Sequence, residues 1–207
     1  MKQEKPAFKS IAPIYGVNYD IGYIGFTYQD DFISRGIAYF TRWNRLSDIK
    51  VTHALVVTGE NECVEALIGA GVVKSKLNRY FENSACKIFF RKPKRWNKKV
   101  GHDIADAALK KVGDGYDNWL IGIQAMCGTL IGRLFKWLTR NTIERISSSV
   151  LNSERKWICS ELVSHSLGSQ PKYSGKGILS HPYNTITPQE LFEDKVIFTP
   201  WKKGGSK

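Results

Sequence analysis

The chain contains little cysteine, and its cysteines are not spaced for metal binding or for a redox pair. Cys63, Cys86, Cys127 and Cys159 include no CxxC pair, and no HExxH motif is present. Zinc knuckles and thioredoxin-like redox sites use those spacings, so we expect neither. No secretory signal is recognisable at the start of the sequence, and free thiols are therefore the expected state of all four cysteines.

Long uncharged apolar runs are also missing. The most apolar segment, residues 119–138, is interrupted by Gln124, Arg133 and Lys136. The uncharged stretch before Arg133 is too short to cross a bilayer. The sequence therefore predicts no transmembrane segment, and we expect a cytoplasmic protein.

Acidic residues are scarce beside basic ones. The 207 residues include 31 Lys and Arg against 19 Asp and Glu, a formal net charge of +12. The excess is concentrated in residues 87–99, around the run FFRKPKRWNKK. A basic patch of this kind can contact phosphates, an anionic membrane surface or an anionic polymer, and a simple solvated surface is the alternative. No recognised nucleic-acid-binding motif accompanies it, so nucleic acid is not an expected partner.

The remaining pattern predicts one α+β domain. Hydrophobic residues make up 42% of the chain, which is typical of a folded globular protein. Short β-type runs at 19–28, 52–59, 62–69 and 86–92 alternate with helical stripes, and 52–69 has the form of a hairpin. Helices are predicted within 32–40, over 98–112 with an end at Gly113, and in the buried segment 119–138. The run TPQEL is a capping box that begins with Thr187.

Cys159 lies in the run WICSELV, where a helix is predicted to begin. The positive end of that helix, together with Arg155 and Lys156, would lower the pKa of the thiol. Amides of the first turn, including that of Cys159, could also stabilise an oxyanion. The alternative is a buried packing cysteine, which is the more usual role of a lone cysteine on an apolar helix.

A nucleophilic cysteine needs a base, and His53 is the best placed of the four histidines. His165 is six positions after Cys159 and would point away from it, while His102 and His181 have no evident orienting partner. His53 opens a strand, and a three-residue hairpin loop, 58–60, would place it directly opposite Glu65. A loop of even length would put the two side chains on opposite faces. A strand-end histidine bonded to backbone and a solvent-facing glutamate are the alternatives.

The two motifs THALVVTGENECVEALIGAGV and WICSELV together resemble one known family. They are similar to the circularly permuted branch of the NlpC-like, papain-related cysteine hydrolases, the YiiX-like proteins, which are distant relatives of the lecithin:retinol acyltransferases. In that branch the histidine hairpin precedes the cysteine helix, as it does here. The likeness spans residues 24–198, with one departure: Gly25 is not followed by the Asp usual in the branch.

The resemblance implies a fold and a set of roles. The fold is a circularly permuted papain-like domain over residues 1–207, with residues 1–20 as an unassigned extension and an antiparallel sheet or half-barrel packed against helices. Cys159 would be the nucleophile, His53 the general base and then acid, and Glu65 the residue that orients His53.

The expected function is hydrolysis of an amide bond through a cysteine acyl-enzyme, without a metal or organic cofactor. Peptides, isopeptides, N-acyl amides and peptidoglycan-like cell-wall peptides are the substrates that the resemblance implies. Two alternatives stay open: a lipid-directed acyltransferase or thioesterase at an anionic membrane surface, and a non-catalytic binding module on the same fold.

Overall fold

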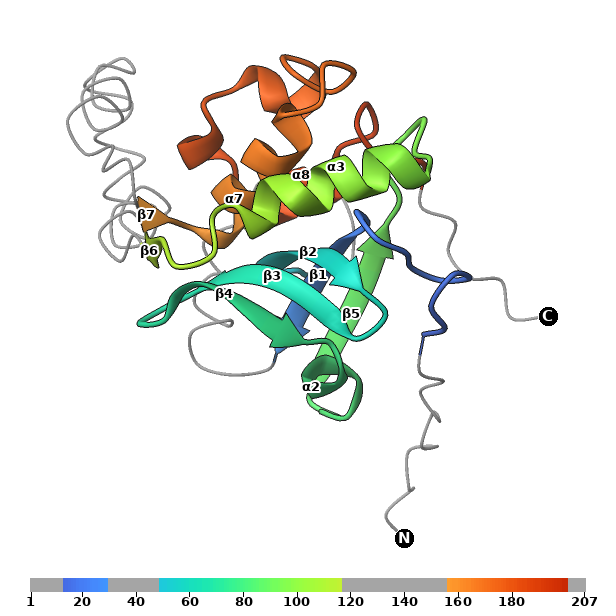
Figure 1. Ribbon diagram of the computed structural model, residues 1–207, viewed down its shortest axis with the longest axis vertical. Helices are drawn as coiled ribbons and strands as arrows, with labels where there is room; N and C mark the ends of the chain where they lie inside the picture. Colours follow the sequence, from blue (N-terminus) through green and yellow to red (C-terminus); the bar gives the residue numbers. More distant parts are fainter. Residues whose placement is uncertain (1–12, 30–48, 117–155, 201–207) are drawn as a thin grey trace, which may run out of the picture.

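A five-stranded antiparallel sheet forms the centre of the molecule (Figure 1), in a computed structural model that describes residues 13–29, 49–116 and 156–200. The strands lie in the order β4-β3-β2-β1-β5. Their bounds are β1 Ile24–Gln29, β2 His53–Gly59, β3 Glu62–Leu67, β4 Gly71–Lys76 and β5 Cys86–Arg91. The predicted α+β class with an antiparallel sheet is confirmed.

The helices are divided unequally between the two faces of this sheet. Helices α3 (Lys98–Leu109) and α7 (Cys159–Gly168) pack against each other and on β2, and α8 (Pro188–Glu193) packs on α7. The short helix α2 (Asn78–Phe81) packs near β5, at the other side of the sheet in Figure 1. Two 3-10 turns, η1 (Gly177–Ser180) and η2 (Tyr183–Thr185), join α7 to α8.

Strand β2 is buried on both faces, which explains its unbroken apolar run. Ala54 and Val56 belong to the larger core beneath α3 and α7, whereas Leu55 and Val57 belong to a smaller cluster on the opposite face. Tyr19 joins this second cluster and stacks on Phe90 with ring centroids 4.6 Å apart. Residues just before β1 are therefore part of the folded domain.

The predicted β2–β3 hairpin is present, but its register differs from the prediction. Val57 pairs with Cys63 rather than Asn61, Gly59 pairs with Glu62, and the turn contains two residues instead of three. A register shift between Val57 and Gly59 adds one residue to β2. A loop of two residues alone would put His53 and Glu65 on opposite faces of the sheet. The extra residue of the bulge brings them back to the same face, placed diagonally rather than directly opposite.

Helix α3 ends at Leu109, three residues before the end of the predicted span 98–112. Val100, Ile104 and Ala108 are buried as the stripe required, but Val112 is 40% exposed and lies in the turn that follows. The turn reaches Gly113, whose positive φ of 98° ends it. The amide of Gly113 donates to the Val72 carbonyl, and this bond holds the chain that follows the helix beside β4.

The chain after Gly113 continues into a second, two-stranded sheet. Two short parallel strands, β6 (Gly115–Tyr116) and β7 (Lys156–Trp157), pair next to β4. The β-type run at 19–28 becomes a strand only from Ile24, because a turn occupies 20–22. The helices predicted within 32–40 and 119–138 lie outside the described residues.

The predicted capping box at the start of α8 is confirmed. Thr187 Oγ1 accepts from the Glu190 amide at 3.2 Å, and the Glu190 carboxylate accepts from the Thr187 amide at 3.0 Å. Over the part of the chain that the structure describes, none of the helices is both long and apolar enough to cross a bilayer.

Candidate active site

Helix α7 begins at Cys159, as the sequence predicts, and its first turn is held from two sides. Ser160 Oγ donates to the carbonyl of Ile186 at 2.6 Å, and Trp157 Nε1 donates to Asp114 Oδ2 at 2.8 Å. Cys159 itself is 7% exposed. The residues on either side of Cys159 in the sequence are therefore fixed by a buried and a partly buried hydrogen bond, while a small part of Cys159 remains open to solvent.

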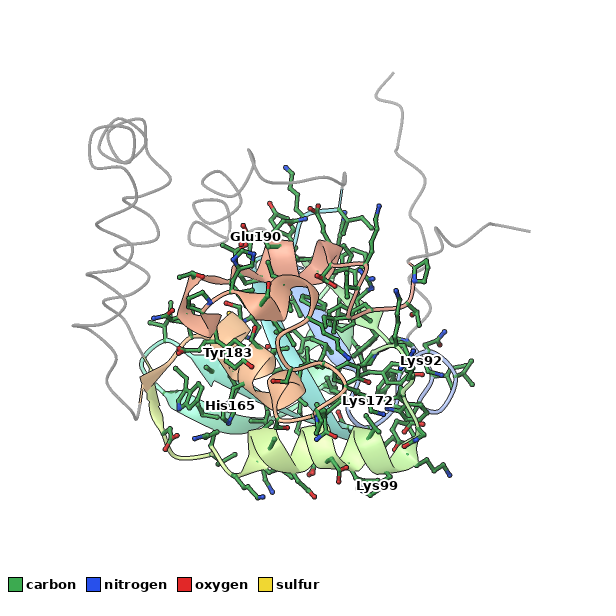
Figure 2. All side chains as sticks on the ribbon, turned by 90° about the horizontal axis from the view of Figure 1, so that it is seen from above. Lys92, Lys99, His165, Lys172, Tyr183 and Glu190 are labelled. Carbon is green, nitrogen blue, oxygen red and sulfur yellow. The ribbon has the colours of Figure 1, made fainter. Side chains whose placement is uncertain are left out.

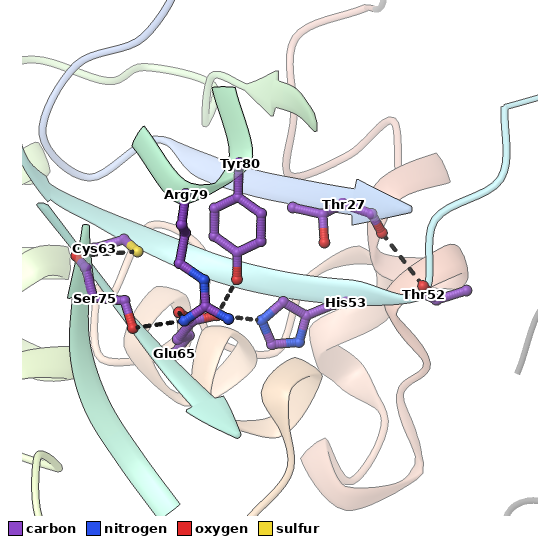
Figure 3. A network of polar contacts seen from close by, with 8 residues as sticks. All are labelled: Thr27, Thr52, His53, Cys63, Glu65, Ser75, Arg79 and Tyr80. Carbon is purple, nitrogen blue, oxygen red and sulfur yellow. Dashed lines mark hydrogen bonds and ion pairs between the residues drawn. The ribbon is translucent and has the colours of Figure 1, made fainter. Parts of the chain in front are cut away.

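His53 and Glu65 form the contact that the hairpin argument predicted. The distance between His53 Nε2 and Glu65 Oε2 is 2.6 Å (Figure 3). The Glu65 side chain is fully buried, whereas that of His53 is 19% exposed. His53 is the first residue of β2, so the imidazole lies at the amino-terminal end of the central strand.

Glu65 has three further partners, which the sequence analysis missed. Tyr80 Oη donates to Glu65 Oε2, Arg79 contacts Oε1 at 3.3 Å, and the Ser75 side chain also bonds the carboxylate. Figure 3 shows Arg79 and Tyr80 reaching it from α2, whereas His53 reaches it from β2. The sequence offered little indication of these partners, because residues 71–81 show no clear strand or helix pattern.

These partners keep the Glu65 carboxylate ionised despite its burial. Burial alone would raise its pKa, but the hydrogen bonds and charge of His53, with the bonds from Ser75 and Tyr80, lower the pKa to about 2. The pKa of Tyr80 is raised, first by burial and second by the charge of the Glu65 carboxylate. A neutral Tyr80 donor and a charged Glu65 acceptor is thus the stable arrangement.

His53 is also hydrogen-bonded to Cys159, which links the two motifs. Because Glu65 occupies Nε2, the nitrogen left for the sulfur is Nδ1. Burial alone would lower the pKa of His53, but the charges and hydrogen bonds of Cys159 and Glu65 raise it above its ordinary value. The residue is therefore stabilised as imidazolium between two acceptors.

The Cys159 thiol shifts in the complementary direction. Burial alone would raise its pKa, but the charge and hydrogen bond of His53 lower it, and the amides of Ala54 and Ser160 donate to the sulfur as well. The two directions agree on a thiolate–imidazolium pair. The charged form of each group stabilises that of the other, which favours the proton on His53 rather than on the sulfur.

The other histidines lie away from this group. The His165 ring packs 5.0 Å from the ring of Trp157, on a later turn of α7, and its pKa is lowered by burial and by Lys111. His102 and His181 are exposed on α3 and after η1. The structure thus brings together Cys159, His53 and Glu65, and none of the other three histidines.

The remaining cysteines do not share the environment of Cys159. Cys63 is buried on β3, where burial raises its pKa, and Cys86 is half-buried at the start of β5. Cys127, Arg155 and the side chain of Lys156 lie outside what the structure describes. Within the described ranges, none of the groups of His, Cys, Asp and Glu is arranged to hold a metal ion.

The first turn of α7 supplies donors as well as the sulfur. Amides at a helix start have no carbonyl partner within the helix, and they carry its partial positive charge. The Ser160 amide donates to the sulfur, and the amide of Cys159 belongs to the same first turn. A thiolate, a protonated imidazole and helix-start amides at one point can together perform acyl transfer.

Comparison with known proteins adds no identity to this geometry. No protein-family model matches the chain, and none of the curated proteins matches it either. The chemistry of the site is therefore what indicates a function.

Proposed function

We propose that this protein is a cysteine hydrolase that cleaves an amide bond through an acyl-enzyme. The observation that carries the proposal is the hydrogen-bonded series from Cys159 through His53 to the fully buried carboxylate of Glu65. A cysteine that served only for packing would have no use for an ionised carboxylate buried behind the histidine that it contacts.

The proposed fold assignment follows the same residues. The hairpin with His53 and Glu65 comes first in the chain, and the helix with Cys159 comes late. This order, with an antiparallel sheet against the cysteine helix, supports a circularly permuted papain-like domain.

The reaction follows from the protonation states. The Cys159 thiolate attacks the carbonyl carbon, and the Cys159 amide stabilises the resulting oxyanion. His53 gives its proton to the leaving amine as the C–N bond breaks, which leaves a thioester. His53 then takes a proton from water, the water oxygen attacks the thioester, and the acid and the thiolate are released. Glu65 does not touch the reacting atoms; it orients His53 and stabilises the imidazolium.

The substrate class that best fits this proposal is a peptide, an isopeptide or an N-acyl amide, and cell-wall peptides are one source of such bonds. An amide needs a protonated general acid for its poor leaving group, and a stabilised imidazolium supplies it. The alkoxide of an ester is a better leaving group, so ester cleavage depends less on a protonated general acid.

Alkylation by limiting iodoacetamide as a function of pH, with mass-spectrometric mapping of each cysteine, tests the proposal. We expect Cys159 to react fast at neutral pH, with an apparent pKa below the ordinary value of about 8.5. His53→Ala should slow it markedly, whereas His102→Ala, an exposed control, should not. A Cys159 that reacts only after unfolding, or equally fast in both variants, would contradict the proposal and favour a non-catalytic module.

A further inference from the structure

A second feature of the molecule is a basic pocket far from Cys159. The pocket encloses about 260 Å³ and is built from three separate segments of the chain. Lys94 and Arg95 follow β5, residues 172, 173 and 176 follow α7, and residues 196–197 follow α8. Neither Cys159 nor its partners His53 and Glu65 line this pocket, whose residues 172, 173 and 176 follow the end of α7 that is opposite to Cys159.

The lining of this pocket carries positive charge only. Four of its seven residues are cationic and none is acidic; they are Lys94, Arg95, Lys172 and Lys176. Among the described residues, none of these four cations forms an ion pair. Four like charges around one hollow repel each other, and a bound anion would remove that repulsion.

The ammonium groups are held in place by backbone carbonyls rather than by carboxylates. Lys94 Nζ donates to the Lys195 carbonyl at 2.5 Å, Lys172 Nζ to that of Arg95 at 3.2 Å, and Lys176 Nζ to that of Lys172 at 2.9 Å. An ammonium has three N–H donors, so each of these keeps donors for a ligand. The charge of these ammonium groups is not neutralised. Because the hydrogen bonds already order the lysine side chains, part of the entropy cost of ordering them for a ligand has been met.

The backbone at Arg95 is in the left-handed region, with φ of 56°, and it is the one non-glycine residue described there. Residues in this region cost free energy and persist where surrounding contacts fix them. Here the amide of Lys94 donates to Ile197 at 2.7 Å, and Tyr173 Oη donates to the Lys94 carbonyl at 2.8 Å. The loop is therefore held in a conformation that places the Arg95 side chain at the pocket.

The basic segment at 87–99 now divides into two parts with different roles. Arg91 is 4% exposed and donates to the carbonyls of residues 192, 194 and 199, so it is not available to a ligand. Lys94 and Arg95 instead meet Lys172 and Lys176 across the pocket. In Figure 2 the labelled Lys172 lies toward the same side of the molecule as Lys92, away from His165.

We propose that this pocket binds a phosphate group, either free or as part of an anionic lipid headgroup. Convergent cations with spare N–H donors match its several acceptor oxygens, and the volume exceeds that of one phosphate. The apolar side of the pocket, formed by Tyr173, Val196 and Ile197, accommodates the organic part of such a ligand. The proposal is independent of the function proposed for Cys159.

Calorimetric titration of the full chain with inorganic phosphate and with pyrophosphate tests the site. The pocket variant is Arg95→Asn with Lys172→Gln and Lys176→Gln; Asn tolerates the left-handed backbone. The control variant, Lys87→Gln with Lys98→Gln and Lys110→Gln, removes the same charge from exposed positions outside the pocket. We expect saturable binding to the wild type and the control, and at least a tenfold weaker affinity in the pocket variant.

Vesicle co-sedimentation distinguishes the two sources of phosphate. Vesicles of phosphatidylcholine with phosphatidic acid are compared with phosphatidylcholine alone. Binding to the anionic vesicles that the pocket variant loses indicates a headgroup; binding of free phosphate without vesicle binding indicates a soluble ligand. Equal weakening in the pocket and control variants, or no saturable binding to either probe, would overturn the proposal. Lys176→Gln alone serves if the triple pocket variant does not fold, as judged by its thermal melt.

Discussion

Glu65 is the residue on which the chemistry of the candidate site depends. Its carboxylate is fully buried, yet it is hydrogen-bonded to His53 on β2 and to Tyr80 on α2. An unpaired charge at this position would cost several kcal/mol, so its partners are required for the fold as well as for His53. The same network therefore stabilises the protein and sets the protonation of the Cys159–His53 pair.

At this scale, Glu65→Gln should raise the apparent pKa of Cys159. The amide carries no charge to stabilise the His53 imidazolium, and the thiolate loses its counterion in turn. We expect alkylation of Cys159 near neutral pH to slow by roughly tenfold, as about one pKa unit implies. The control is Glu62→Gln, an exposed position on the same strand whose carboxylate pairs with Lys76 at 3.1 Å. An unchanged pH profile in Glu65→Gln would show that the carboxylate is only structural.

At the scale of elements, β5 ends on a buried arginine that ties the carboxyl-terminal segment to the sheet. The Arg91 guanidinium donates to three carbonyls of that segment and lies between the rings of Phe192 and Phe198, about 5 Å from each centroid. Burial lowers the pKa of Arg91 to about 10, with Asp194 acting in the opposite direction. A residue that composition assigns to a basic surface is thus a structural anchor.

Arg91→Lys should therefore destabilise the protein although it keeps the charge. A guanidinium is planar and carries its donors in a rigid fork, so it can reach three separate carbonyls and lie over aromatic rings. The compact ammonium of lysine can do neither. We expect a loss of about 2–3 kcal/mol in the free energy of unfolding, measured by urea denaturation. Lys98→Arg, at an exposed position, should change it by less than about 0.5 kcal/mol. A stable Arg91→Lys protein would mean that the carbonyls find other donors.

The contact between α3 and the turn before β1 predicts a second effect at this scale. A Cβ added at Gly101 would lie 2.3 Å from the Ile21 carbonyl oxygen and 2.7 Å from Trp96 Nε1. The oxygen is backbone and accepts from that Trp96 nitrogen, so neither group can move freely.

Gly101→Ala should consequently destabilise the fold by about 1–3 kcal/mol, even though alanine favours helices. Thermal unfolding followed by circular dichroism measures the change. Asp106→Ala, at an exposed position of the same helix, is the control and should be nearly neutral. If Gly101→Ala melted at or above the temperature of the wild type, the close approach of α3 to Ile21 would be refuted.

At the scale of the whole molecule, the two sides of the sheet perform different tasks. The side that carries α3 and α7 holds most of the apolar core, and the side that carries α2 holds the partners of Glu65. His53 lies where these regions meet, because the first residues of the central strand β2 contact Cys159 at the start of α7. The candidate site therefore needs both sides to be folded.

Stability of the whole protein should fall in acid for a defined reason. The pKa of Glu65 is about 2 when folded and about 4.3 when unfolded. Its contribution, about 3 kcal/mol, is complete above the unfolded value and is lost as pH falls from there toward the folded value. Urea denaturation at a series of pH values below about 5 measures this loss. Glu65→Gln, with no proton to bind, should show a shallower pH dependence; an identical slope in both proteins would count against this account.

The sequence predicted local elements correctly but not the register in which the strands pair. The hairpin, the helix start at Cys159 and the capping box at Thr187 each depend on neighbouring residues, and each is present. The pairing of β2 with β3 was wrong by two positions, because a bulge depends on how the strands twist against the rest of the sheet. His53 and Glu65 meet nonetheless, since a shift of two residues preserves the face.

The sequence by itself thus determined the local elements and the residues of the candidate site that they bear: a histidine and a glutamate on one hairpin, and a cysteine at a helix start. Only the tertiary structure decided the contacts between distant segments. Arg79 and Tyr80 reach Glu65, Arg91 is withdrawn into the core, and Lys172 faces Arg95 across a pocket. Periodicity and capping are local and can be read along the chain, whereas these contacts join segments that the packing of the whole domain brings together.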